Sequence, residues 1–156
     1  MALISDNSSF VISGIELKNR SWSNTTGLIQ GVTTITSSNE AKKDFNGFQN
    51  TQSIAEYTHA SAAYECTVTQ FKNGQMGYLA SVGEWMEIIN NLDEINRCMS
   101  LIDGLDIDEG TTSYWTSTQY NYEKAWLVTY NGNEFYPNDE RKGVSFYAIR
   151  VISQLI

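Results

Sequence analysis

The sequence predicts a single α+β domain, in which two amphipathic helices come first and pack on a small antiparallel sheet. Two stretches, residues 50–69 and 83–102, repeat apolar side chains at the three- and four-residue spacing of a helix. From residue 113 onward the chain is instead rich in aromatic and β-branched residues, the types that favour strands. A length of 156 residues with 41% hydrophobic residues is enough for one buried core and too little for two domains.

A short β-rich segment, residues 1–35, precedes the helix-and-sheet domain, which we place at residues 36–156. The segment alternates aliphatic with small polar residues, and glycines such as Gly14 are expected to break it. Three short strands are expected here, at residues 10–12, 15–17 and 28–32. The segment either docks the domain onto a neighbouring protein or supplies a first strand and its loops.

The first predicted helix follows the turn signal Asn46-Gly47. Asn50 or Thr51 is expected to be its N-cap, because their side-chain oxygens can accept from free backbone N–H groups. His59 falls beside the small apolar face of this helix, and without a second histidine it is interpreted as structural.

The second predicted helix starts at a capping box made by Ser81 and Glu84, whose side chains satisfy each other's backbone donors. It runs from Gly83 to about Ile102 and presents a strong apolar face that includes Trp85.

Two polar segments carry oxygen ligands of the kind that Ca²⁺ takes. Residues 44–50 place Asp44 and two asparagines near a turn, but no later acidic ligand follows. Residues 103–110 carry alternating carboxylates whose spacing matches no calcium motif. The first is interpreted as a turn before a helix and the second as a solvated acidic turn, and no metal site is predicted.

Strands are expected in the C-terminal part at residues 113–118, 124–130, 134–136 and 145–152. Asn131-Gly132 lies between two of them and is a strong hairpin signal, because both residues tolerate positive φ.

The charge of the chain excludes some partners. A formal net charge of −8 makes a phosphate-tracking surface improbable, so no nucleic-acid partner is expected.

No apolar run approaches the roughly 20 residues of a membrane helix. The first seven residues have no basic and apolar signal pattern, which favours synthesis in a bacterial host cytoplasm.

Three motifs occur in order within residues 44–152. They are Tyr78-Leu-Ala-Ser-Val-Gly-Glu-Trp85, Tyr114-Trp-Thr-Ser-Thr118 and Arg150-Val151. Their order and spacing resemble the C-type-lectin fold in its bacterial and phage form, the group of diversity-generating-retroelement variable proteins and formylglycine-generating-enzyme-like domains. Ala80 stands where the pattern has proline, which affects a turn. The resemblance implies a C-type-lectin-like fold and a phage virion protein.

The matching residues are expected to be structural. Trp85, Trp115 and Trp126 would each stabilise the core by about 2 to 3 kcal/mol if fully buried. Arg150 lies between aliphatic residues and is expected to pair with a buried carboxylate, Glu84 or Asp103, or with carbonyl groups.

The resemblance also implies a ligand-binding face built by the last strands and their loops. These segments concentrate tyrosine and asparagine, which antibody loops use for rigid contact area and adaptable hydrogen bonds. The candidate ligand-binding residues are Tyr120, Asn121, Tyr122, Asn131, Asn133, Phe135, Tyr136, Asn138, Asp139, Arg141 and Tyr147.

The predicted function is a non-enzymatic binding or structural module of a bacteriophage virion, on a fibre, tail or capsid. Its expected partners are a host cell-surface protein or glycan and other virion proteins, with a homotrimer supplying avidity. Cys66 and Cys98 are interpreted as free buried thiols in helices. The pair of reactive cysteines that formylglycine-generating oxidases need is therefore missing. No catalytic set and no cofactor are predicted.

Two alternatives stay open. A scaffold protein would bind only its virion neighbours. A calcium-dependent lectin would need a Glu-Pro-Asn-like triplet, to which the segment Tyr136-Pro-Asn-Asp139 is a partial match.

Overall fold

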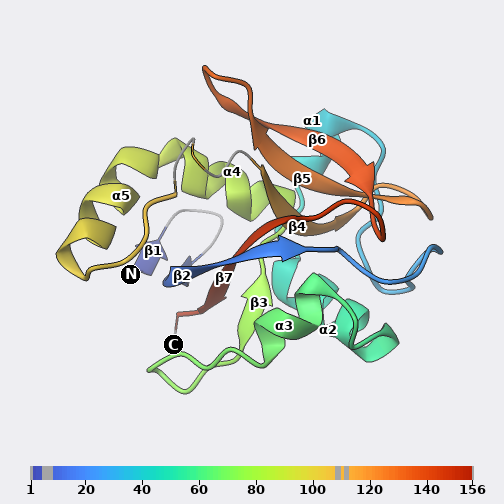
Figure 1. Ribbon diagram of the computed structural model, residues 1–156, viewed down its shortest axis with the longest axis horizontal. Helices are drawn as coiled ribbons and strands as arrows, with labels where there is room; N and C mark the ends of the chain where they lie inside the picture. Colours follow the sequence, from blue (N-terminus) through green and yellow to red (C-terminus); the bar gives the residue numbers. More distant parts are fainter. Residues whose placement is uncertain (1, 5–8, 108–109, 111–112, 156) are drawn as a thin grey trace.

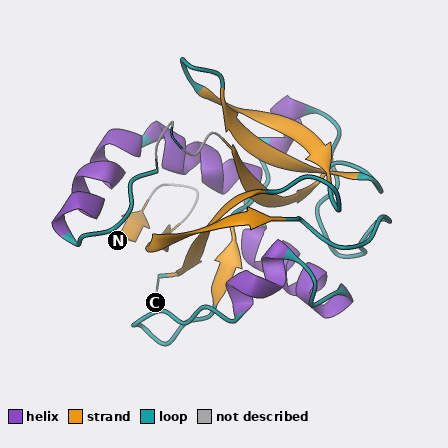
Figure 2. Cartoon of the chain, viewed as in Figure 1, coloured by secondary structure: helices purple, strands orange, loops and turns teal. Residues whose placement is uncertain are grey.

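The chain folds as one sheet with helices on both of its faces. The structure is a computed structural model that describes residues 2–4, 9–107, 110 and 113–155. Figures 1 and 2 show the sheet through the middle of the molecule, with helices α2 and α3 below it and α4 and α5 above and to the left. The α+β class is therefore confirmed.

Seven strands make up the sheet in this described part of the chain. They are β1 (Ala2–Ile4), β2 (Ser9–Arg20), β3 (Gly77–Leu79), β4 (Ser113–Gln119), β5 (Lys124–Tyr130), β6 (Phe135–Arg141) and β7 (Tyr147–Gln154). The order is β1-β2-β7-β4-β5-β6, and β3 pairs with β7 as well. Since β4 and β7 pair in parallel, the sheet is mixed, and the purely antiparallel sheet expected from the sequence is wrong.

Each of the two predicted helices is interrupted. The helices are α1 (Ser38–Ala41), α2 (Gly47–Tyr57), α3 (Ala62–Thr67), α4 (Val82–Asn90) and α5 (Leu92–Leu101). Thr58 is extended, and the Ser61 side chain accepts from the Tyr64 backbone as the N-cap of a new helix. The capping box of Ser81 and Glu84 is confirmed at the start of α4.

The N-cap prediction for the first helix is wrong. Asn46 occupies that position, and both Asn50 and Thr51 are buried inside α2. The Thr51 hydroxyl donates to the Gly47 carbonyl and accepts from the Leu79 backbone, so it joins α2 to β3. An N-cap residue is normally more exposed than Asn50 and Thr51 are. Their side chains make tertiary contacts instead of capping the helix.

The N-terminal strands also differ from the prediction. Residues 10–12 and 15–17 belong to one long strand, β2, and Gly14 does not break it. The pairing of β2 with β7 shifts register between Ile12 and Glu16, so Gly14 lies in an irregularity within the strand. Residues 28–32 form no strand, although Ile29 and Val32 are buried. The division of the chain at residue 35 stays a prediction.

Alternating side chains of the central strands build a separate core on each face of the sheet. Tyr114 packs with Trp85 of α4 on one face, at a ring-centroid distance of 4.8 Å. The next residue, Trp115, packs with Cys66 of α3 on the other face. This alternation follows from the two-residue period of a strand. Trp85, Trp115 and Trp126 are all buried, as expected.

Arg150 lies fully buried in β7 and pairs with Glu16 of β2, at 3.1 Å. Its guanidinium also donates to the carbonyls of Leu105 and Asp106, at 2.8 and 2.9 Å. The expected carboxylate partners, Glu84 and Asp103, are therefore wrong, while the expected carbonyl partners are confirmed. The acidic segment 103–110 holds the arginine through its backbone; residues 108 and 109 of it lie outside the described residues.

A buried polar cluster joins α2, α4 and β4. The Asp44 carboxylate accepts from the Asn50 amide and the Thr118 hydroxyl, at 3.0 and 2.7 Å. The Glu84 carboxylate accepts from the Ser81 backbone at 2.8 Å. Burial raises the pKa of Glu84 to about 7, and the negative charge of Asp44 adds to this shift.

The raised pKa of Glu84 gives a testable pH dependence. A carboxyl group with a folded-state pKa near 7 contributes stability below its ordinary pKa, and that stability is lost as the pH rises through 7. Wild type should therefore lose stability relative to Glu84→Gln between pH 5 and 7.5, as measured by urea unfolding. The exposed Glu56→Gln is the control and should show no such change. Parallel pH curves for wild type and Glu84→Gln would contradict the assignment.

Candidate functional site

The predicted ligand-binding residues do not form a single face. Tyr120, Asn121 and Tyr122 lie in the turn before β5, whereas Asn131 and Asn133 lie in the turn after it. A strand of seven residues separates these turns by about 20 Å, at roughly 3.3 Å per residue. Figure 1 shows the two turns at opposite ends of the β5–β6 hairpin.

Several of these side chains already have structural partners. The side-chain oxygens of Asn121 and Asn131 each accept from two backbone N–H groups and hold their own turns. Phe135 is buried in the core with Tyr114. Asp139 pairs with Lys124 across the strands at 2.6 Å. These residues shape the hairpin and are not free to bind a ligand.

Of the other candidates, Tyr120 and Tyr147 pack edge-on against Trp126 and Trp115. Asn138, Tyr136 and Asn133 lie along the edge strand β6 or in its turn. Tyr122 and Arg141 are exposed at the end of the molecule where β5 begins.

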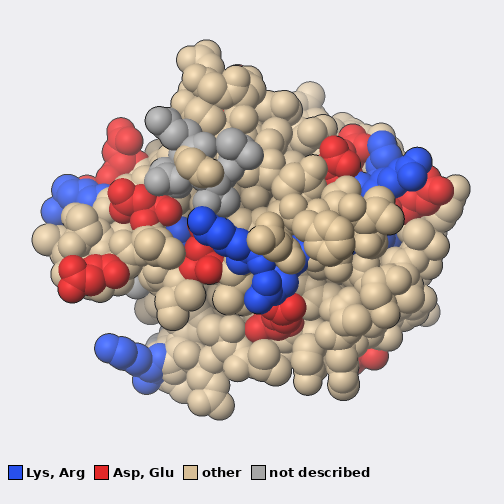
Figure 3. Space-filling model, viewed as in Figure 1, with Lys and Arg blue, Asp and Glu red and all other residues tan. Residues whose placement is uncertain are grey.

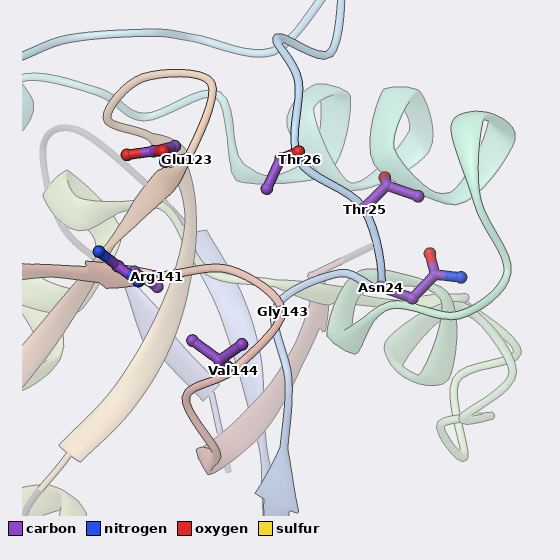
Figure 4. Close-up of a pocket in the computed structure, with 7 residues that line it drawn as sticks. All are labelled: Asn24, Thr25, Thr26, Glu123, Arg141, Gly143 and Val144. Atoms are coloured by element: carbon purple, nitrogen blue, oxygen red, sulfur yellow. The ribbon is translucent and has the colours of Figure 1, made fainter.

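A pocket of about 320 Å³ opens at that end, which we call the loop end. Three loops form it: residues 21–28, 120–123 and 142–146. Figure 4 shows Glu123 and Arg141 on one side, the residues of the first loop on the other, and Gly143 and Val144 between them. The lining residues are Asn24, Thr25, Thr26, Glu123, Arg141, Gly143 and Val144.

Lys142 fixes the three loops relative to one another. Its backbone carbonyl accepts from Trp22 and its backbone N–H donates to the Glu123 carbonyl, at 3.0 Å each. Its side-chain ammonium donates to the Gly27 carbonyl at 2.8 Å and to the Gln119 side-chain oxygen. The pocket walls are thus tied together below the surface.

The Lys142 ammonium is fully buried without a carboxylate partner among the described residues. It lies 4.8 Å from the centre of the Trp22 ring, in cation–π geometry. Burial lowers the pKa of Lys142 to about 8, because the apolar surroundings disfavour the charged form.

Comparisons with known proteins identify a solved structure with a similar fold. No family model and no curated protein sequence matches the chain. The chain is similar to part of a solved structure, that of a fimbrial protein from Bacteroides ovatus. The TM-score is 0.64 at 20% sequence identity, over 94% of this chain and 35% of the other. The chain thus spans about a third of that protein, and what they share is the fold.

Sequence reasoning identified only part of this pocket. Of the residues that line it, only Arg141 is among the predicted ligand-binding residues, and Tyr122 lies beside the pocket. The residues of the first loop and the buried Lys142 were missed. Asn24 and Arg141 lie far apart in the sequence and are brought together by the sheet order β2-β7-β4-β5-β6. No local pattern marks Lys142, since a pair of basic residues is normally solvated surface.

Exposed apolar side chains accompany the pocket. Tyr122 is 55% exposed, Val144 68% and Phe146 60%. A second exposed set, Ile15 and Leu101 among them, lies at the other end. Figure 1 shows β1 and the end of β7 at this other end, so both chain ends face away from the loop end. Figure 3 shows acidic and basic side chains side by side at the loop end.

The thiols lie in different elements, Cys66 in α3 and Cys98 in α5. Cys66 is buried, and burial raises the pKa of its thiol, which makes it a poor nucleophile and metal ligand. Cys98 is only partly buried, which corrects the expectation of two buried thiols.

In the described ranges no three His, Cys, Asp or Glu side chains converge on a possible metal position, and no helix is long and apolar enough for a bilayer crossing.

The two thiols should differ in reactivity. At pH 8, native protein should react quickly with a disulfide reagent at Cys98 and slowly at Cys66, and both should react in urea. Cys98→Ser should remove the fast phase. Fast reaction of the Cys98→Ser protein without denaturant would contradict the burial of Cys66.

Proposed function

We propose that the chain is a non-enzymatic binding module that attaches a fibre-like assembly to another surface through its loop end. The observation that carries the proposal is the loop end itself. It combines a pocket, exposed apolar side chains and two charged side chains, Glu123 and Arg141, that form no ion pair within the described part of the chain. These groups lie on loops, or at the adjoining end of β6, that Lys142 fixes in place. Rigid loops on a packed scaffold are the common arrangement of binding sites.

The position of the site supports this role. The first strand and the end of the last strand lie opposite the loop end (Figure 1). A neighbouring protein joined near either chain end would therefore leave the pocket facing outward. The fold is shared with part of a fimbrial protein. The sequence resemblance favours the equivalent position on a phage virion, where a homotrimer would raise avidity.

The polar contacts favour this proposal over a calcium-dependent lectin. In the segment Tyr136-Pro-Asn-Asp139, the carboxylate of Asp139 is paired with Lys124 and Pro137 is buried in the edge strand. The Asp139 carboxylate, one of the groups that would need to bind a calcium ion, is thus already paired with a lysine.

The test is binding of the labelled protein to a panel of intact bacterial and epithelial cells. The test variant, Tyr122→Ser with Val144→Ser, removes apolar surface at the loop end. The control variant, Val68→Ser with Leu101→Ser, removes similarly exposed apolar surface elsewhere. Sedimentation must show equal mass for all three proteins.

We expect saturable binding that the loop-end variant loses and the control keeps. Equal binding by both variants would place the binding surface elsewhere and overturn the proposal. No binding to any cell would also overturn it, and would favour a scaffold protein that binds only its neighbours.

A further inference from the structure

Lys142 and Gln119 bring an amine and a side-chain amide into contact in the interior of the protein. Both side chains are fully buried, and the Lys142 Nζ atom lies 2.5 Å from the Gln119 Oε1 atom. The amide carbon is about 1.2 Å from that oxygen, so it lies at most roughly 3.7 Å from the amine nitrogen. The nitrogen and the carbon are thus close to the separation at which a nucleophilic attack begins.

The contacts of Gln119 fix which end of its amide faces the lysine. The Oε1 atom accepts from the Ile29 backbone N–H at 3.1 Å, and the Nε2 atom donates to the Thr34 hydroxyl at 2.9 Å. Exchanging the two ends would set the amide nitrogen against the Ile29 N–H and the lysine amine, which are both donors. The carbonyl end of the amide therefore faces Lys142.

The surroundings of Lys142 favour the form of the amine that can react. Only a neutral amine is a nucleophile, and burial lowers the pKa of Lys142 to about 8. In the part of the chain that the structure describes, no carboxylate pairs with this amine. Its other contacts are the Gly27 carbonyl and the Trp22 ring. At pH 8 a large fraction of the amine is therefore neutral while it is held against the amide.

We infer that Lys142 and Gln119 react with each other and form an isopeptide bond. The neutral amine attacks the Gln119 Cδ atom, so a bond forms between Nζ and Cδ, and the bond between Cδ and Nε2 then breaks. The proton that Nζ loses passes to Nε2, which leaves as ammonia. The product is a secondary amide between the two side chains, and no oxidant, reductant or further reactant is consumed.

Two neighbouring groups suit this reaction. The Ile29 N–H donates to the Gln119 Oε1 atom, where negative charge develops during the attack, as a backbone donor does in an oxyanion hole. The Thr34 hydroxyl contacts the leaving nitrogen and donates to the Val32 carbonyl. Because a hydroxyl both accepts and donates, it can carry a proton to that nitrogen.

The bond would join the end of β4 to the loop after β6, with β5 between them. It would make permanent the contact through which Lys142 ties the loops together. In the bonded form Lys142 no longer titrates, so the pH dependence that its lowered pKa gives to stability belongs to the unreacted form.

The experiment is mass spectrometry of the whole protein, freshly purified and after prolonged incubation in native buffer at pH 9. Bond formation should lower the mass by about 17 Da, the mass of one ammonia molecule. Trypsin digestion should then give one branched peptide that joins residues 98–124 to residues 142–150. Ammonia can also be lost at an Asn-Gly turn such as Asn131-Gly132, but that reaction leaves only linear peptides.

Lys142→Met is the test variant and should give no branched peptide. Lys124→Met is the matched control, because that lysine pairs with Asp139 and has a partly exposed side chain; it should form the bond as wild type does. The branched peptide is read from the wild type itself, so the result does not depend on how well Lys142→Met folds. A native wild type that keeps its full mass, or a mass loss confined to linear peptides, would overturn the inference.

Discussion

Replacing Gly47 with alanine should destabilise the protein by about 3 kcal/mol, the upper part of the usual range for overpacking a core. A Cβ atom at this position would lie 2.0 Å from a carboxylate oxygen of Glu84 and 2.9 Å from the Ser81 backbone nitrogen. Both atoms belong to the capping box at the start of α4. The capping box cannot move without breaking the bond that the Ser81 hydroxyl donates to the Asp44 carbonyl. The measurement is urea unfolding followed by tryptophan fluorescence.

The control for this substitution is Gln49→Ala, at an exposed position of the same helix. Alanine favours helix, so this change should leave the free energy of unfolding within about 0.5 kcal/mol of wild type. A Gly47→Ala protein as stable as the control would show that α2 and α4 do not approach this closely.

Lys142→Met should cost about 3 kcal/mol and should loosen the loop end. Methionine keeps the apolar stem but leaves the Gly27 carbonyl and the Gln119 oxygen without their donor. An unsatisfied buried acceptor costs about 1 to 3 kcal/mol. We expect lower stability in urea and faster proteolysis within residues 21–28. Lys124→Met is the matched control, because its partly exposed pair with Asp139 should be worth less than about 1 kcal/mol.

The pH dependence distinguishes the buried ammonium from a purely steric effect. The folded-state pKa of Lys142, about 8, lies below its ordinary value of 10.5, so the unfolded chain holds the proton to higher pH. Stability from this group therefore rises with pH through that interval. The stability difference between wild type and Lys142→Met should be larger at pH 9.5 than at pH 7. Tyrosine and cysteine titrations occur in both proteins and cancel; a constant difference would contradict the lowered pKa.

Local patterns predicted most of the secondary structure. The capping box at Ser81, the Asn131-Gly132 hairpin and strand β5 all follow from neighbouring residues, and the structure has them where expected. Interruptions of the helices were not predictable, because apolar spacing continues across the breaks at Thr58 and Asn91.

Long-range partners could not be predicted from the sequence, for a different reason. Arg150 was expected to find a carboxylate, but Glu16 lies 134 positions away and only the register of β2 against β7 brings it close. The binding face was expected from tyrosine and asparagine content. Composition does not distinguish Asn121, which holds a turn, from Tyr122, which faces solvent.

The way Lys142 ties the loops has an evolutionary consequence. Of the bonds that join the three loops, most use main-chain atoms, and the side chains needed are those of Lys142 and Gln119. Natural selection, or a combinatorial library, could therefore vary Thr25, Thr26, Tyr122 and Val144 widely without disturbing the framework beneath them. Such a chain could change its target over few generations while its fold stays the same.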